Sequence, residues 1–108
     1  MLCGNLLSAM TYFVVTRRIG PDWNRLLRLE EQQDWPDHAT FMDGLVDTGF
    51  LILGGPLADE RRVILVVEAP SEEAVRATLE RDPWHDRLLQ IESVDGWTIR
   101  LDGRSRDP

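Results

Sequence analysis

The spacing of apolar and polar residues divides the chain into extended and helical stretches. Four segments rich in β-branched, aromatic or other apolar residues are expected to be strands: residues 11–17, 50–57, 61–69 and 88–101. Inside the last segment, Asp95-Gly96 fits either a β-bulge or a two-residue hairpin turn. The pattern therefore predicts four strands, the last of which is irregular.

Amphipathic helical spacing occurs in three stretches: residues 23–33, 35–48 and 71–81. Pro36 suits a first helical turn because its missing N–H leaves no donor unpaired there, and Asp34 or Trp35 occupies the cap position. Gly49 is the expected stop of this helix, and Ser71 is the expected N-cap of the last one.

The order of these elements is strand, helix pair, strand, strand, helix, strand. This order is the split β-α-β plan of a ferredoxin-like α+β domain, with an antiparallel sheet and helices on one face. At 108 residues the chain is expected to form one domain over 11–101. We expect a flexible leader over residues 1–10 and a flexible tail over 102–108; the true start is either Met1 or Met10.

The first three strand segments are apolar at consecutive positions, as in YFVV, FLIL and VILVV. Such strands have two apolar faces, and the helices of so small a domain cover only one of them. A second copy packed sheet to sheet is the simplest cover, since symmetric dimers are the commonest assemblies. The sequence therefore predicts a homodimer formed through the open face of the sheet.

Charge and composition exclude several classes of function. The net charge of −7 argues against nucleic acid and against an anionic membrane surface, because both require a basic face. All 12 basic residues are arginine, so the chain has no lysine for a Schiff base. The single Cys3 has no partner for an internal disulfide, and with no signal peptide or membrane span in the pattern a cytoplasmic location is expected.

His38 is the first candidate for chemistry. At about 100° per residue, four apolar side chains lie within roughly 80° of it on the same helix: Phe41, Met42, Leu45 and Val46. A buried imidazole needs a polar partner or a ligand. A core histidine held by one hydrogen bond is the more common outcome for such a residue taken alone.

Asp82 makes a functional role of His38 more plausible than a purely structural one. The ferredoxin-like plan returns the end of the last helix to the same side of the sheet as the first one, so the carboxyl group of Asp82 is expected to reach the ring of His38. A carboxylate on one ring nitrogen fixes the tautomer and leaves the other nitrogen free to move a proton. The alternative is that Asp82-Pro83 only ends a helix.

Aromatic residues are candidates for a pocket that holds a small ring compound, although packing explains them equally well: Tyr12, Trp35, Phe41 and Trp84. Gly54-Gly55-Pro56 lacks the spacing of a phosphate loop and favours a strand-ending turn. Its alternative role is close approach of a ligand to Gly55 and Pro56.

No cofactor is predicted, and a metal site is not favoured. His85 with Asp86 resembles a catalytic pair or a metal site, but two histidines without a usable cysteine make a weak set of metal ligands. Three arginines, Arg17, Arg61 and Arg62, offer a carboxylate-binding group, although charged strand ends are usually solvated.

The segments WPDHATFMDGLVDTG, LILGGPLAD and VILVVEAPSEEAVRATLERDPW together resemble the YciI-like (YCII-related) domain family. The resemblance runs from Met10 to about Leu101. It implies a ferredoxin-like fold of the dimeric α+β barrel superfamily and an active site on a histidine and an aspartate, which correspond to His38 and Asp82. Residues 85–87 depart from the small residues and glycine often found there, so no substrate is carried over.

The resulting hypothesis is a small cofactor-free enzyme in which His38, oriented by Asp82, moves a proton on a small cyclic or aromatic compound. Lyase or isomerase chemistry is expected, by analogy with relatives in the wider superfamily. The alternative is a non-catalytic ligand-binding or accessory domain in which the two residues form a structural pair.

Overall fold

A computed structural model describes residues 10–105. The described residues form four strands, two α-helices and two short 3₁₀ turns: β1 (Thr11–Ile19), η1 (Leu29–Glu31), α2 (Trp35–Asp47), β2 (Leu51–Pro56), β3 (Arg62–Ala69), α3 (Glu72–Leu79), β4 (Leu89–Trp97) and η2 (Gly103–Ser105). The expected leader and the end of the expected tail, residues 1–9 and 106–108, lie outside the described range. No helix within residues 10–105 is long and apolar enough to cross a membrane.

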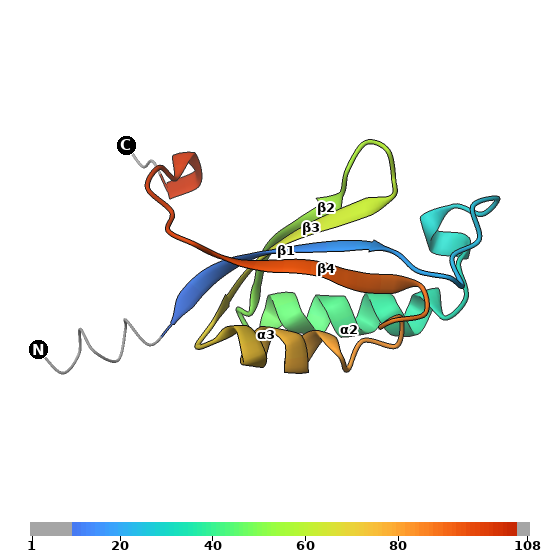
Figure 1. Ribbon diagram of the computed structural model, residues 1–108, viewed down its shortest axis with the longest axis horizontal. Helices are drawn as coiled ribbons and strands as arrows, with labels where there is room; N and C mark the ends of the chain where they lie inside the picture. The colour runs from blue at the N-terminus through green and yellow to red at the C-terminus, as the bar shows by residue number, and fades with distance from the viewer. Residues whose placement is uncertain (1–9, 106–108) are drawn as a thin grey trace, which may run out of the picture.

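The sheet has the strand order β2-β3-β1-β4, and every neighbouring pair of strands is antiparallel. Both helices lie against the same face of this sheet (Figure 1). The α+β class, the antiparallel sheet and the helices on one face are therefore confirmed.

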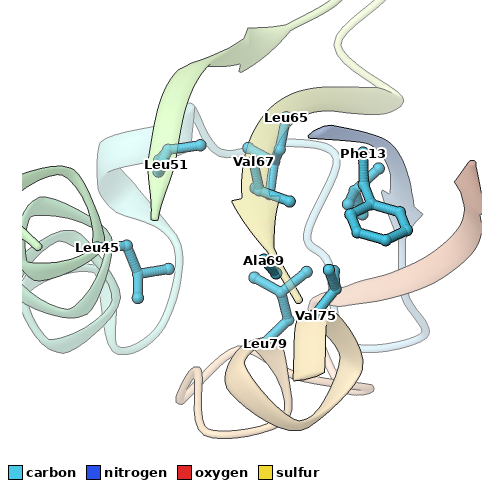
Figure 2. Close-up of a cluster of buried hydrophobic side chains, with 9 residues drawn as sticks. Phe13, Leu45, Leu51, Leu65, Val67, Ala69, Val75 and Leu79 are labelled. Atoms are coloured by element: carbon cyan, nitrogen blue, oxygen red, sulfur yellow. The ribbon is translucent and has the colours of Figure 1, made fainter. Parts of the chain in front are cut away.

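Burial alternates along β1, which places the core on the helix side. Phe13, Val15 and Arg17 are buried, whereas Val14 and Thr16 between them point to the other face and are only half-buried. Figure 2 shows the main core between the sheet and the two helices. Its buried members are Phe13, Val15, Leu45, Leu51, Leu65, Val67, Ala69, Val75 and Leu79.

The predicted helix ends are largely confirmed. α2 begins at Trp35 with a proline in its first turn, and Gly49 follows it with φ +85°, a conformation that glycine adopts without steric cost. Asp34 occupies the cap position, but its side chain makes no capping hydrogen bond. Ser71 caps α3, because its hydroxyl accepts the N–H of Ala74 at 3.1 Å.

The predicted helix over residues 23–33 is wrong. This stretch consists of turns and the single 3₁₀ turn η1, and Leu26, expected on the inner side, is 92% exposed. The buried side chain of Gln32 makes the hydrogen bonds that a helix would make within its backbone. It accepts the N–H of Asn24 and donates to the carbonyls of Asn24 and Leu27.

The expectation for Asp95-Gly96 is also wrong in both of its forms. These residues continue β4, where Asp95 pairs with Val14 and Gly96 with Phe13. A Cβ on Gly96 would lie 4.0 Å from the ring of Phe13, an ordinary van der Waals contact. The register shift of this pair lies elsewhere, at Glu92, and the strand ends at Trp97 instead of residue 101.

Two glycines are predicted to respond in opposite directions to replacement by alanine. A Cβ at Gly20 would lie 2.5 Å from the carbonyl oxygen of Arg87, so Gly20→Ala should destabilise the protein by about 1–3 kcal/mol. Nothing lies within 4 Å of a Cβ at Gly44 inside α2, so Gly44→Ala should stabilise it by about 1 kcal/mol. Urea unfolding measures both, and a Gly20→Ala protein as stable as the wild type would contradict the packing described here.

Candidate functional site

Three side chains from separate parts of the chain meet on the helix side of the sheet. His38 comes from the beginning of α2, Arg17 from β1, and Asp82 from the turn after α3. Nδ1 of His38 lies 2.8 Å from Oδ1 of Asp82, and Nη2 of Arg17 donates to Oδ2 of Asp82 at 2.8 Å. The expected contact between His38 and Asp82 is therefore present.

The sequence after α3 orients the carboxylate locally. The backbone N–H of Trp84 donates to Oδ1 of Asp82 at 2.9 Å, and the N–H of His85 donates to the Asp82 carbonyl. Such turns are typical of Asp, whose side chain accepts an N–H two residues further along the chain. The Asp-Pro pair thus ends the helix and also fixes the carboxylate beneath the sheet.

Asp82 is ionised at neutral pH in this setting. Burial alone raises the pKa of this fully buried carboxyl, but the hydrogen bond with His38, the charge of Arg17 and the N–H of Trp84 together hold the pKa below its ordinary value. An ionised carboxylate only accepts hydrogen bonds, so Nδ1 of His38 carries the proton of this contact. Within residues 10–105 nothing bonds to Nε2, and the His38 side chain is 9% exposed.

Trp84 fixes the plane of the imidazole. The two rings are stacked, with centroids 3.9 Å apart and an interplanar angle of 6°. Trp84 is itself fully buried, and its indole N–H donates to the carbonyl of Gln33 at 2.6 Å. The histidine is thereby held from one ring nitrogen and from one ring face.

His38 lines a pocket of about 240 Å³ between α2 and the sheet. Its walls are mainly apolar, and its lining residues are Arg17, Trp23, Leu29, Trp35, His38, Met42, Asp43, Val46, Leu51, Gly54, Gly55, Pro56, Val63, Leu65, Trp84 and Leu89. An apolar hollow with a few convergent polar groups is the usual form of a small-molecule site. The arrangement offers a basic ring nitrogen to an apolar ligand.

The structure brings together most of the candidate site residues. Four of them line the pocket beside His38: Trp35, Gly55, Pro56 and Trp84. Phe41 packs against the main core instead. Tyr12 lies on the opposite face of the sheet, where it pairs with Glu68 and Trp97.

Two details differ from the sequence-based expectations. Gly54-Gly55-Pro56 is not a strand-ending turn, because all three residues belong to β2 and pair with β3. A Cβ on Gly54 would lie 2.7 Å from a methyl group of Leu65, which accounts for glycine there. Val46, expected on the buried stripe, is 54% exposed and lies at the pocket wall.

Arg17 is the site residue whose placement the sequence did not settle. It is fully buried, whereas Arg62 forms an exposed ion pair with Glu92 at 3.2 Å and Arg61 is exposed. The sequence does contain a sign that Arg17 is buried. Alternate residues of a strand face the same side of the sheet, and Arg17 follows the inward-facing Phe13 and Val15 at intervals of two. No group of three or more histidine, cysteine, aspartate or glutamate side chains within residues 10–105 is arranged to hold a metal ion.

Comparison of the chain with protein-family models, with curated proteins and with solved structures found no match.

Removing the Asp82 carboxyl should destabilise the protein strongly at neutral pH. Asp82→Ala leaves Arg17 buried without its partner, a change that typically costs about 3–5 kcal/mol. Asp82→Asn keeps the shape but loses the charge and should fall between the wild type and Asp82→Ala. Urea unfolding at pH 7 measures both effects, with Asp47→Asn on the exposed side of α2 as the control.

The lowered pKa of Asp82 also determines how the stability of the protein changes in acid. The folded-state pKa of this carboxyl lies below the ordinary value of 3.8, so its stabilising contribution is complete above that pH and is lost as the pH falls through the lowered value. Asp82→Asn should therefore lose less stability than the wild type on acidification below pH 4. Equal pH dependence of the two proteins would show that the ion pairs do not hold Asp82 ionised.

Proposed function

We propose that this protein is a small enzyme in which His38 moves a proton on a small cyclic or aromatic compound, as a lyase or an isomerase does. The observation that carries the proposal is the 2.8 Å contact of Nδ1 with the buried Asp82 carboxylate, beside a pocket that the same imidazole lines. The contact leaves Nε2 as the basic atom.

The proposed chemistry uses only groups of the chain. Nε2 of His38 takes a proton from a carbon next to an electron-withdrawing group, and the imidazolium that forms is stabilised by Asp82. Return of the proton to another carbon gives an isomerase, and departure of a leaving group gives a lyase. Asp82 acts through His38 and is a positioning residue. This reaction requires no metal or cofactor.

The strand order and the resemblance noted in the sequence support a classification. An antiparallel sheet of order β2-β3-β1-β4 with both helices on one face matches a ferredoxin-like plan. We assign the chain, as part of the proposal, to the YciI-like family of the dimeric α+β barrel superfamily, with a cytoplasmic location.

A homodimer belongs to the same proposal. The face of the sheet opposite the helices carries Val14, Ile64 and Val66 on the two central strands, with Leu53 and Trp97 further out. Leu53 is 51% exposed and Trp97 is 43% exposed. An apolar sheet face of this kind is usually covered, and a second copy supplies a matching surface.

A non-catalytic ligand-binding domain is the second candidate. Its support is the burial of the ion pairs, since the side chains of Arg17 and Asp82 are 0% exposed. Buried ion-pair networks also occur as purely structural devices. In that case the pocket binds its ligand without changing it.

Exchange of carbon-bound protons with solvent tests the enzymatic function without a known substrate. The probes are cyclohexanone, 2-cyclohexenone and γ-butyrolactone in D₂O, followed by proton NMR. The wild type should speed the loss of a proton next to the carbonyl for at least one probe. His38→Gln should lower that rate about 10²- to 10⁴-fold, because positioned proton transfer contributes this much.

The control is His85→Gln, which removes the other histidine and should leave the exchange rate unchanged. An unchanged rate in His38→Gln would refute the role of this residue. If the probes bind beside Trp84 but the wild type does not speed proton exchange, the enzymatic function is refuted and the ligand-binding domain is favoured.

Light scattering after size-exclusion chromatography tests the dimer. The wild type should have twice the 12.4 kDa mass of the chain. Val66→Glu places a charge in the centre of the open face and should give single chains, whereas Leu26→Glu, at an apolar residue exposed on the segment between β1 and α2, should remain dimeric. A wild-type mass of one chain would rule out this interface.

A further inference from the structure

The guanidinium of Arg17 is incompletely bonded. Nη2 donates to Asp82, but Nε and Nη1 are buried and have no acceptor within residues 10–105. The arginine lies on the core side of β1, between Val63 of β3 and Ile91 of β4, so its neighbours in the sheet offer no acceptor side chain either. Buried N–H groups of a charged donor are unfavourable unless an acceptor is supplied.

Asp82 does not complete this bonding, because it bonds neither Nε nor Nη1 of Arg17. One carboxylate oxygen accepts from Arg17, and the other is in contact with both His38 and the N–H of Trp84. The cluster therefore has unused donors on the arginine. These donors call for an acceptor from outside the described residues.

Arg17 is part of the wall of the pocket that His38 lines. The guanidinium is fully buried, so an acceptor in the pocket reaches it only when side chains of the pocket wall move aside. The charged or titratable side chains around the pocket are those of Arg17, His38 and Asp43, and Asp43 is an exposed residue of α2. The buried end of the pocket therefore holds an ion pair whose arginine has unused N–H donors, and its remaining walls are largely apolar.

We infer that the pocket binds a small carboxylic acid, with its carboxylate on the free N–H groups of Arg17 and its apolar body among the aromatic and aliphatic walls. A guanidinium suits the planar, charged carboxylate better than a neutral oxygen. The volume of about 240 Å³ fits one small ring, since a cavity of about 150 Å³ holds benzene.

Charge balance links this ligand to the proposed reaction. In the proposed reaction His38 starts as a neutral proton acceptor, and with Arg17 positive and Asp82 negative the cluster then has no net charge. When His38 takes a proton the cluster becomes positive, and a bound carboxylate offsets that charge in an apolar setting. The inference names the substrate class of the proposed enzyme and rests on that function for the role of His38, but binding is measured separately from turnover.

The test compares benzoate with benzamide, which has nearly the same shape and no charge. Both are titrated into the ¹⁵N-labelled wild type at pH 7 and constant ionic strength. Benzoate should bind at least tenfold more tightly, and it should shift the Nε–H signal of Arg17 and the indole N–H signal of Trp84. Benzamide should leave the Arg17 signal unmoved.

Three variants separate the possible sources of this preference. Arg17→Gln should reduce the preference for benzoate to less than twofold. Arg18→Gln removes the neighbouring arginine, which is exposed on β1, and should keep the preference. His38→Gln should also keep it, because the carboxylate contacts the arginine and not an imidazolium.

Arg17→Gln leaves a buried carboxylate without its ion pair, so Arg17→Lys serves as the second variant. It keeps a positive charge beside Asp82 but lacks the planar fork of N–H donors that suits a second carboxylate, and should lose most of the preference. Equal binding of benzoate and benzamide by the wild type, or a full preference in Arg17→Lys, would overturn the inference. If the preference for benzoate depends on Arg17 but the exchange experiment detects no proton transfer, the carboxylate site stands and only the enzymatic function is refuted.

Discussion

The structure depends on the burial of one ionised carboxylate, that of Asp82. Removing such a group from water costs several kcal/mol unless donors replace the lost hydration. Here the donors come from β1 through Arg17, from α2 through His38 and from the local turn through the N–H of Trp84. The requirement to satisfy this carboxylate therefore ties the sheet, the first helix and the end of the second helix into one arrangement.

The contacts that satisfy the carboxylate also prepare the imidazole for chemistry. Asp82 determines which nitrogen of His38 carries the proton, and the stacked Trp84 determines the plane of the ring. The wall of the pocket is built from the same elements, so a ligand would meet a ring whose orientation is already fixed. Stability and the proposed function therefore draw on the same few side chains.

The two faces of the sheet are used differently. On the helix side, alternate residues of β1 pass from the core at Phe13 and Val15 to the polar cluster at Arg17. On the other side, Val14 and Val66 pair across the centre of an apolar face that neither α-helix covers (Figure 1), and residues 99–104 lie beside its edge. This division explains why the strands are apolar at consecutive positions.

Local patterns in the sequence determined the four strands, α2, α3 and the inward direction of His38, because periodicity, caps and stop signals act within a few residues. They did not determine the conformation of residues 23–33, where the side chain of Gln32 bonds to backbone several residues away. Nor did they decide between a helix-ending and an orienting role for Asp82, or between a solvated and a buried Arg17. Only the packed structure decided these, since the partners lie 44 and 65 residues apart in the chain and meet through the strand order of the sheet.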